Sequence, residues 1–400
     1  MTIAIICEYN PFHNGHAAQI AWLRAAHPGC RIICIMSGCF TQRGEPAILP
    51  PYDRARAAVL GGADLVVELP QPWASGSAEY FAAGGVAVAD GLGIVDALAF
   101  GCESGDLAAP MAVAARLDSP EFRAALAGEG DPAEGAAARA ARLWRERWGD
   151  DGGMLSRPNN LLAVEYCRAL RRLGAAIAPL PMRREGSDYG DTALSHANPS
   201  ATAVRAALAA GEAPEALGGY LPAGTIEVLR EAIAAGRAPV FPAGLGQAVL
   251  AHYRLADPDA LSVCASMRGG LAHRLCAAAR EARGLDEMLA LAATKVYTNT
   301  RIRRAVLQGM LGVTEADLAA APSGTLLLAA NAAGRELLRE IRRRGGMPVV
   351  TKPADLAGAV TERELILRRR AEALYTLAMP EPLSAGEFVK CAPFFANFAP

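Results

Sequence analysis

The chain opens with Thr2-Ile-Ala-Ile-Ile-Cys-Glu-Tyr-Asn-Pro-Phe-His-Asn-Gly-His16, an apolar run followed by a turn that carries two histidines. The run from Ile3 to Cys7 has the length and the β-branched composition of a buried strand, and Asn10-Pro11 ends it. Residues 17–26 have a helical composition. The two histidines are therefore expected at a junction where a buried strand passes into a helix.

This junction has the features of a phosphate-binding site. Asn14-Gly15 supplies a backbone that can approach a ligand closely. The start of the following helix is expected to offer free N–H groups and a partial positive charge, which together favour an anion. His13 and His16 beside it can stabilise the charge that builds up when an α-phosphate is attacked. The sequence therefore predicts a nucleotide site in which both histidines stabilise the transition state.

Strands and helices alternate over the first 100 residues. Apolar strands are predicted at residues 31–36, 64–69 and 96–100, with helices at 52–60 and 77–89 between them. This alternation predicts an α/β fold, a Rossmann-like parallel sheet with helices on both faces. Ligands bind such sheets at the carboxyl ends of the strands, which is where both histidines, Gly38 and Gly101 fall.

The second half of the chain is predicted to be mainly helical. Segment 211–224 is rich in glycine, proline and alanine, which predicts a boundary between a nucleotide-binding domain at residues 1–215 and a mainly helical domain at 216–400. Before the boundary we predict a helix at 160–173, a strand at 175–182 and a helix at 201–208 capped by Ser200. After it, helices are predicted at 226–235, 245–254, 272–283, 285–294, 300–311, 335–344 and 363–377.

Composition narrows the class of protein. A chain of 400 residues is longer than a single hydrophobic core usually supports, so two domains are the default expectation. There are 40 basic and 41 acidic residues, so any nucleic-acid surface must be local. Nine scattered cysteines form neither a disulfide framework nor a zinc motif, and we predict no metal site. No signal sequence or long apolar span is visible, which predicts a cytoplasmic protein without membrane contact, and no protein partner is evident.

Several blocks of sequence resemble a known family. His13-Asn-Gly-His16 has the H-x-G-H pattern of the nucleotidyltransferase superfamily. Within that superfamily, three segments resemble the bacterial tRNA(Met) cytidine acetate ligase family. They are Glu8-Tyr-Asn-Pro-Phe-His-Asn-Gly-His16, Met36-Ser-Gly-Cys-Phe-Thr-Gln-Arg-Gly-Glu-Pro-Ala47 and Gly62-Ala-Asp-Leu-Val-Val-Glu-Leu-Pro70. Later blocks that fit are Phe100-Gly-Cys-Glu103, Pro158-Asn-Asn-Leu-Leu-Ala-Val-Glu-Tyr166, Ser200-Ala-Thr-Ala-Val-Arg205 and Lys295-Val-Tyr-Thr-Asn-Thr-Arg-Ile-Arg-Arg304. Their order along the chain extends the resemblance over most of it.

The resemblance implies a set of ATP contacts, some of them through backbone groups. The first set is Cys7, Glu8, Tyr9, Asn10, Pro11, Phe12, His13, Asn14, Gly15, His16, Ala17, Ala18, Gln19 and Ile20. The others are Gly101, Asn160, Arg184, Ser200 and Arg205, with Asn159 and Arg183 as the adjacent alternatives to Asn160 and Arg184. Ordinary structural roles compete with three of these assignments, because Asn160 and Ser200 can cap helices and Arg205 can lie on an exposed helix face.

A glycine-bearing loop follows the second strand. Gln42-Arg43-Gly44-Glu45 either forms a tight surface turn or closes over the reacting end of ATP or the small carboxylate. In the second case Arg43 can orient a phosphate or acetate by bidentate bonding. Asp64 and Glu68, which flank the third strand, are interpreted as structural.

The segment from Lys295 to Arg304 combines basic, aromatic and short polar side chains, which suits phosphate contacts and base stacking with RNA. The predicted RNA contacts are Lys295, Tyr297, Arg301, Arg303 and Arg304, with Tyr297 as the stacking residue. By contrast, Arg368 to Arg370 are interpreted as a solvated helix face.

The resemblance implies a ligase that activates acetate with ATP. Acetyl-adenylate would form first, with Mg²⁺ accompanying the triphosphate, and the acetyl group would pass to N4 of the wobble cytidine, C34, of elongator tRNA(Met). The alternatives are an adenylyltransferase for a small metabolite and a non-catalytic protein that binds nucleotide or RNA.

Overall fold

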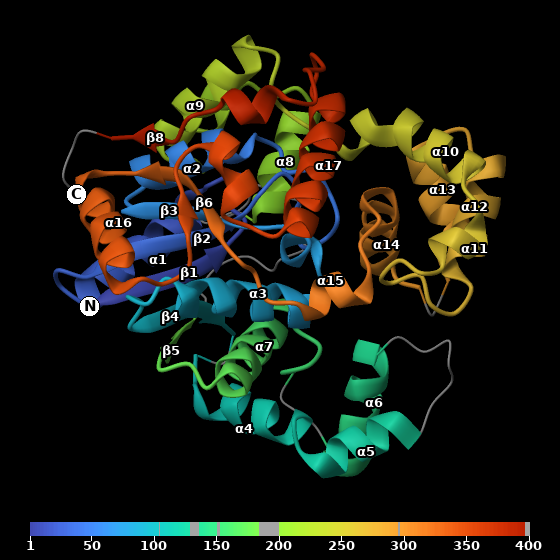
Figure 1. Cartoon of the computed structure of the whole chain (residues 1–400), viewed down its shortest axis with the longest axis horizontal. Coiled ribbons are helices and arrows are strands. Elements are labelled where there is room, and N and C mark those ends of the chain that lie inside the picture. Colours follow the sequence, from blue (N-terminus) through green and yellow to red (C-terminus); the bar gives the residue numbers. More distant parts are fainter. Residues whose placement is uncertain (104, 129–135, 150–152, 184–199, 295–296, 397–400) are drawn as a thin grey trace.

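A single mixed sheet forms the centre of the molecule (Figure 1). The computed structural model describes residues 1–103, 105–128, 136–149, 153–183, 200–294 and 297–396. The strands are β1 (Thr2–Cys7), β2 (Arg31–Ser37), β3 (Leu65–Leu69), β4 (Ala97–Cys102), β5 (Ala178–Arg183), β6 (Thr325–Ala330), β7 (Val349–Val350) and β8 (Phe394–Phe395). Their order is β5-β4-β1-β2-β3-β6-β7, and β8 also pairs with β6.

The first five strands form the predicted parallel sheet. β1 lies between β2 and β4, and all the pairs from β5 to β3 are parallel. The carboxyl ends of these strands therefore share one edge of the sheet, where ligands bind in open α/β folds. The Rossmann-like α/β fold is confirmed.

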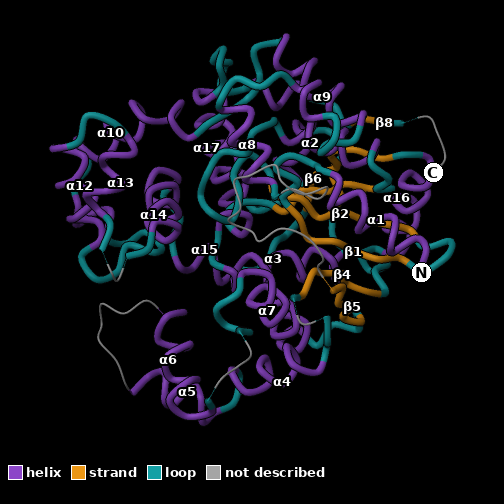
Figure 2. The backbone as a smooth tube through the Cα atoms, turned by 180° about the vertical axis from the view of Figure 1, so that it is seen from behind, coloured by secondary structure: helices purple, strands orange, loops and turns teal. Residues whose placement is uncertain are grey.

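Helices cover both faces of this sheet (Figure 2). Residues alternate along a strand between its two faces, so Ile3 and Ile5 pack with α1 (Asn14–Ala26) and α2 (Pro51–Leu60). Ala4 and Ile6 face the opposite way, toward α3 (Ala78–Gly91), α7 (Pro158–Leu173) and α16 (Ala332–Arg344). The remaining helices are α4 (Ala108–Leu117), α5 (Pro120–Gly128), α6 (Ala136–Trp148), α8 (Ala201–Ala209), α9 (Ala223–Ala234), α10 (Gly246–Leu255), α11 (Pro258–Leu261), α12 (Leu271–Glu281), α13 (Leu285–Ala292), α14 (Asn299–Leu311), α15 (Glu315–Ala319) and α17 (Glu362–Ala378).

The later helices divide into two groups. Helices α10 to α13 gather away from the sheet, and α14 lies between them and the rest of the molecule (Figures 1 and 2). Helix α16 packs on the sheet, against β2, β3 and β6, whereas α17 lies next to α14. In the described part of the chain, no helix has both the length and the apolar character needed to cross a membrane.

Strand β6 is the main element that the sequence analysis missed. It joins the sheet antiparallel to β3, with Leu65 opposite Ala330, so the sheet is mixed. All six residues of Thr325-Leu-Leu-Leu-Ala-Ala330 are buried. A short apolar run of leucine and alanine has no periodicity that distinguishes a buried strand from a buried helix. The predicted boundary at residues 215 and 216 therefore does not separate the sheet from the helices, because β6 lies beyond it.

The interpretation of Arg368 as a solvated residue is wrong. Its guanidinium forms ion pairs with Glu68 at β3 and, at 2.7 Å, with Glu372 on the same helix. Arg368 is only 7% exposed, because its side chain turns inward to Glu68 of β3, whereas its neighbours Arg369 and Arg370 are exposed as expected. The pairing confirms the structural role predicted for Glu68.

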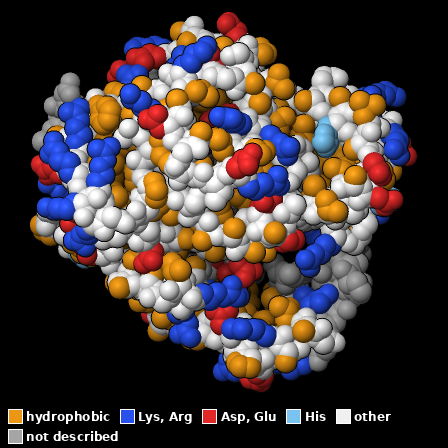
Figure 3. Space-filling view, viewed as in Figure 1, with side chains coloured by type: hydrophobic (Ala, Val, Ile, Leu, Met, Phe, Trp, Pro, Cys, Tyr) orange, Lys and Arg blue, Asp and Glu red, His pale blue; other side chains and the backbone are white. Residues whose placement is uncertain are grey.

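The arginines at the end of α16 behave as solvated residues. Arg342, Arg343 and Arg344 are exposed, and basic side chains gather over this helix at the left of the space-filling view (Figure 3). Arg344 pairs with Glu340 one turn earlier at 2.8 Å. Such exposed pairs contribute little to stability.

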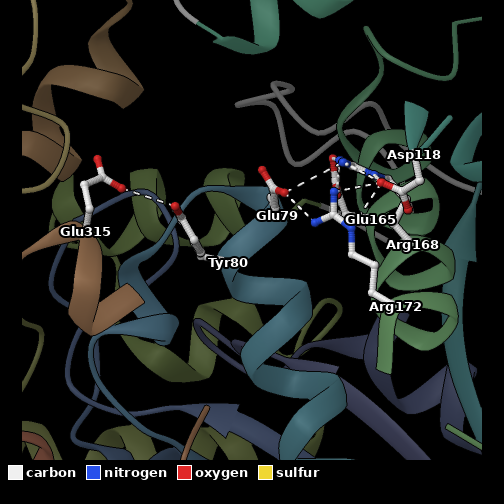
Figure 4. A network of polar contacts seen from close by, with 7 residues as sticks. All are labelled: Glu79, Tyr80, Asp118, Glu165, Arg168, Arg172 and Glu315. Carbon is white, nitrogen blue, oxygen red and sulfur yellow. Dashed lines mark hydrogen bonds and ion pairs between the residues drawn. The ribbon is translucent and has the colours of Figure 1, made fainter. Parts of the chain in front are cut away.

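An ion-pair network fixes α7 against its neighbours (Figure 4). Arg168 bonds to Glu165 at 2.8 Å on the same helix and to Asp118, at the end of α4, at 3.1 Å. Arg172 bonds to the same Asp118 and to Glu79 of α3, both at 2.7 Å. The network therefore joins three helices, and it holds the helix that carries Asn159 and Asn160.

Candidate active site

The turn between β1 and α1 is anchored by its aromatic side chains. Tyr9 and Phe12 are fully buried, and the Tyr9 hydroxyl lies 3.5 Å from Cys34 Sγ in β2. Cys7 and Ile20 are also buried in the core. For these four residues of the predicted ATP cradle, contact with a nucleotide can come only through the backbone in this conformation.

The two predicted catalytic histidines lie together at the start of α1. His13 is the N-cap, and its Nδ1 accepts the N–H of Gly15 at 3.1 Å. His16 Nδ1 accepts the N–H of His13 at 3.3 Å. The two rings stack with centroids 3.7 Å apart. Because a ring nitrogen that accepts a hydrogen bond carries no proton, these two contacts make Nε2 the nitrogen that bears the proton in each ring.

The prediction of free N–H groups at this helix start is wrong. The N–H groups of Asn14, Gly15 and His16 bond to Tyr220 O at 3.0 Å, to His13 Nδ1 at 3.1 Å and to His13 O at 2.9 Å. The physical reason is twofold: His13 caps its own helix, and the predicted boundary segment 211–224 folds back against it. The backbone N–H groups at the start of α1 are therefore already bonded in this conformation.

Two glycines at this edge of the sheet differ in the space around them. A Cβ built on Gly15 would lie 2.9 Å from His13 Cε1, so only glycine lets the imidazole reach its capping position. A Cβ built on Gly101, at the end of β4, would meet no atom within 4 Å. Open space beside Gly101 fits the predicted approach of a nucleotide.

Arg205 reaches the same turn from α8. Its Nη1 donates to Asn10 O at 2.9 Å, and its Nη2 donates to Thr202 Oγ1 at 3.3 Å. The alternative of an exposed helix face is therefore wrong for Arg205. Ser200 is the N-cap of α8, with Oγ accepting the N–H of Ala203 at 3.1 Å, which confirms the predicted cap.

The Asn159–Asn160 pair closes the end of β4. Asn160 Oδ1 accepts the Glu103 N–H at 2.9 Å, and Asn159 Nδ2 donates to Glu103 Oε1 at 2.8 Å. Asn160 is 1% exposed, whereas Asn159 is partly exposed. Both side chains thus bond to Glu103, two residues after Gly101 in the chain, so both stay candidates. Arg184 lies outside the described residues, and its alternative Arg183 ends β5 opposite Cys102.

Two polar side chains of the cradle, the partly exposed Glu8 and the buried Asn10, bond to backbone groups after β2. Glu8 Oε1 accepts the Gln42 N–H at 2.6 Å, which ties the end of β1 to the glycine-bearing loop. Asn10 Oδ1 accepts the Ile48 N–H at 2.7 Å beyond that loop. The rest of the predicted cradle comprises Pro11, which is buried, and Asn14, Ala17, Ala18 and Gln19, which are partly or fully exposed.

One important residue was missed by the sequence analysis. Arg54 is fully buried and donates to the carbonyl oxygens of Ser37 at 2.8 Å and Leu49 at 3.1 Å, and also to those of Glu8 and Gly38. Burial lowers the pKa of this guanidinium. Arg54 therefore joins the ends of β1 and β2 to the loop that follows β2. The sequence gives only a weak signal, because Arg54 is one of two arginines in a helix that also carries Asp53.

The predicted RNA-binding segment lies at the start of α14. Lys295 is outside the described residues. Tyr297 is 6% exposed, its hydroxyl donates to Gly269 O at 2.5 Å, and the Arg301 guanidinium lies 4.8 Å from its ring centroid. Little ring surface is left for stacking on a base in this conformation. Arg303 forms an ion pair with Glu45, and burial, with Arg301 and Arg43 nearby, lowers the pKa of Arg304 to about 10.

An open cavity of about 720 Å³ lies beside this segment. His273 and Arg274 from α12 line it together with Tyr297. Within the described ranges, no group of three or more histidine, cysteine or acidic residues is arranged to hold a metal ion.

Comparison with known proteins places these features in a family. Residues 1–387 match the sequence model described as HIGH Nucleotidyl Transferase. A tRNA(Met) cytidine acetate ligase from Acetivibrio thermocellus is 33% identical over 398 residues, which is 95% of each chain. The protein of that name from Syntrophotalea carbinolica is 38% identical over 363 residues, covering 87% of this chain and 84% of the relative.

Solved structures agree with the sequence comparison. Thermotoga maritima TmcAL in an apo form has a TM-score of 0.90 and 28% identity, covering 99% of this chain and 100% of that one. A second crystal form, bound with alpha-thio ATP, has the same TM-score and coverage at 26% identity. The chain thus belongs to the HIGH nucleotidyl transferase family and, within it, to the tRNA(Met) cytidine acetate ligases.

Proposed function

We propose that this protein is an ATP-dependent ligase that acetylates N4 of the wobble cytidine, C34, of elongator tRNA(Met). The observation that carries the proposal is similarity along the whole chain to proteins named for this reaction, together with the paired histidines at the β1–α1 junction. The reaction takes place in the cytoplasm, where eight buried cysteines and the partly buried Cys391 stay reduced.

The first step activates acetate. A carboxylate oxygen attacks the α-phosphorus of ATP, the bond to pyrophosphate breaks, and acetyl-adenylate forms. Negative charge shifts onto the phosphate oxygens, where the Nε2–H groups of His13 and His16 donate hydrogen bonds. When bound with the triphosphate, Mg²⁺ would neutralise part of its charge. Neither histidine has to remove a proton, because acetate is already ionised.

The second step transfers the acetyl group. The cytidine N4 attacks the acetyl carbonyl carbon, AMP leaves, and the amine loses one proton. Acetate is a poor acyl donor, so the AMP leaving group drives the transfer. Positioning of the two substrates is then the main contribution of the protein, and no covalent enzyme intermediate is needed.

The ATP contacts follow the edge of the sheet. Residues 7–20 hold the phosphates and adenosine, largely through the backbone, and Gly101 gives the nucleotide room. Asn160 or Asn159, Arg184 or Arg183, Ser200 and Arg205 complete the site. The RNA approaches α14, where Arg301, Arg303 and Arg304, together with Lys295, supply phosphate contacts, and Tyr297 is the base-stacking residue once its ring is exposed.

The direct test supplies ATP, labelled acetate and a bacterial tRNA pool to the purified protein. We expect label in N4-acetylcytidine at position 34 of elongator tRNA(Met), with AMP and pyrophosphate formed in equal amounts. Label that stays out of tRNA while AMP and pyrophosphate accumulate would instead point to a small-metabolite adenylyltransferase. ATP binding without any turnover would indicate a non-catalytic protein that binds nucleotide or RNA.

A further inference from the structure

Tyr9 adopts a backbone conformation that bulky residues rarely accept. Its φ is +46°, in the left-handed region, and its side chain is only 1% exposed. A residue other than glycine is strained in this region, and it stays there only where the surrounding structure fixes it. Such strained residues are concentrated at active sites. The contacts that hold Tyr9 are therefore candidates for a functional role.

Both neighbours of Tyr9 are fixed by distant parts of the chain. Glu8 O accepts a hydrogen bond from the guanidinium of Arg54, which lies on α2. On the other side, Asn10 Oδ1 accepts the N–H of Ile48 at 2.7 Å. Both partners come from the segment that follows β2. The left-handed turn at Tyr9 therefore depends on how that segment packs against the end of β1.

Arg54 holds the ends of two neighbouring strands at once. Besides Glu8 O after β1, its guanidinium binds Ser37 O in β2 at 2.8 Å, Gly38 O and, at 3.1 Å, Leu49 O. In the described part of the chain, every acceptor recorded for this buried cation is an uncharged oxygen. Desolvation offsets much of the energy of such bonds. The main effect of Arg54 is then geometric, because it fixes the end of β1 relative to the end of β2.

The ring of Tyr9 lies directly against the histidine pair. Its centroid is 4.6 Å from that of His16, and the Phe12 ring packs on it edge to face at 4.9 Å. The Tyr9 hydroxyl lies 3.5 Å from Cys34 Sγ. His16 in turn stacks on His13, with centroids 3.7 Å apart. A ring enclosed in this way sets the position of His16 and, through it, that of His13.

We propose that Arg54 is a positioning residue for adenylation, which acts through Tyr9 to hold His16 and His13 where the α-phosphate reacts. The path runs from the guanidinium to Glu8 O, along the left-handed backbone at Tyr9, and across the ring contact to His16. This inference rests on the proposed function, because it takes adenylation of acetate as the reaction. Both the Arg54 and the Tyr9 side chains are buried, so neither reaches ATP in this conformation.

The first test measures acetate-dependent exchange of pyrophosphate into ATP by the full chain and by Arg54→Lys. Lysine keeps the positive charge, but a single nitrogen cannot reach all four carbonyl oxygens. A residue that only orients groups acting in the transition state should affect kcat and not ATP binding. We therefore expect kcat to fall by about tenfold to a hundredfold, the range for a small displacement of catalytic groups. The ATP dissociation constant should stay within about twofold of the parent value.

Substitution of Tyr9 tests the same path from its other end and leaves the buried charge in place. Tyr9→Phe keeps the ring against His16 and loses only the weak contact to Cys34, so kcat should stay within about threefold of the parent value. Tyr9→Leu removes the ring contact and should lower kcat as Arg54→Lys does, again with unchanged ATP affinity. Because both residues act on His16 through one path, the double variant with Arg54→Lys should lose no more than about twofold beyond the weaker single variant.

Arg254→Lys is the matched control. The guanidinium of Arg254 also donates to backbone carbonyls, those of Ala279 at 2.8 Å and Ala282 at 2.7 Å, but it lies on α10, away from the sheet (Figure 1). Its kcat should equal that of the parent. All rates are expressed per ATP-binding site, titrated by calorimetry, so that a loss of folded protein is not counted as a loss of kcat.

Several results would overturn the inference. A purely structural Arg54 predicts fewer ATP-binding sites in Arg54→Lys with the parent kcat per site. A loss of ATP affinity as large as the loss of kcat would mean that Arg54 shapes the nucleotide site as a whole. Where Arg54→Lys does not fold, the Tyr9 variants decide, because equal kcat values in Tyr9→Leu and Tyr9→Phe contradict the path through the ring.

Failure of this inference can be told apart from failure of the proposed function. If the parent protein shows acetate-dependent exchange, while Arg54→Lys and Tyr9→Leu match the parent in kcat, only the inference fails. If the parent shows neither exchange nor acetylation of tRNA, the proposed function fails, and this inference fails with it.

Discussion

The imidazole rings of His13 and His16 stack with their centroids 3.7 Å apart and their planes inclined by 27°. Each ring accepts a backbone N–H through Nδ1, and each therefore holds its proton on Nε2. Protonation of either Nδ1 would break one arm of the capping box and place a positive charge against the other ring. The capping contacts thus favour the Nε2–H tautomer of both histidines.

His13 has two roles that substitution can separate. His13→Ala removes the N-cap and should lower the free energy of unfolding by about 0.5–2 kcal/mol, as well as adenylation activity. His13→Asn restores a side-chain acceptor for the Gly15 N–H but has no Nε2–H, so it should recover stability and not activity. Urea unfolding and pyrophosphate exchange, measured on both variants, test this. Full activity in His13→Asn would show that capping alone is what His13 supplies.

Gly101 and Gly15 make a matched pair. Gly101→Ala adds a methyl group into open space, so it should leave the thermal midpoint unchanged and weaken ATP binding at least tenfold. Gly15→Ala should displace the His13 ring, which lies 2.9 Å from the added Cβ, and lower activity even where ATP still binds. Calorimetric titration with ATP checks the first variant. An unchanged ATP affinity would mean that the nucleotide does not use the space beside Gly101.

Arg205 is expected to act through the β1–α1 turn. Arg205→Met breaks the 2.9 Å bond to Asn10 O and removes a cation that faces the proposed triphosphate, so ATP affinity should fall by about tenfold or more. Arg230→Met is the control, because this substitution removes the same charge from an exposed position on α9. Equal ATP affinities in the two variants would contradict the assignment of Arg205.

The network around Arg168 should matter for stability (Figure 4). Arg168→Met leaves the mostly buried Glu165 and Asp118 carboxylates without this partner, and the free energy of unfolding should fall by about 3 kcal/mol. Burial already raises the pKa of Glu165, so it should become protonated more readily in the variant. Arg142→Met, in an exposed pair with Glu146, should cost less than about 1 kcal/mol. Equal losses in urea unfolding would mean that the network adds nothing beyond a surface pair.

Local chemistry in the sequence predicted much of the site. The β-branched run before Asn10 predicted β1, and the composition after it predicted α1, which puts His13 and His16 at the junction. Ser200 was predicted as a cap from its residue type and position. Strand β6 was missed because six leucine, alanine and threonine residues carry no decisive pattern.

The contacts that complete the site join residues far apart in the chain. Asn14 bonds to Tyr220, Arg205 to Asn10, and Arg303 to Glu45. Each depends on how helices pack after they form, and neither periodicity nor turn chemistry in one sequence encodes that packing. For the same reason the sequence suggested free N–H groups at the start of α1, where Tyr220 and His13 in fact bind them.

The most direct test of the central claim is exchange of labelled pyrophosphate into ATP, without tRNA, by the parent protein and by His16→Ala. The account predicts exchange that requires acetate, and a loss of about a hundredfold or more in His16→Ala with the circular dichroism spectrum unchanged. Acetate-dependent exchange at the parent rate in His16→Ala would show that the β1–α1 junction does not activate the carboxylate.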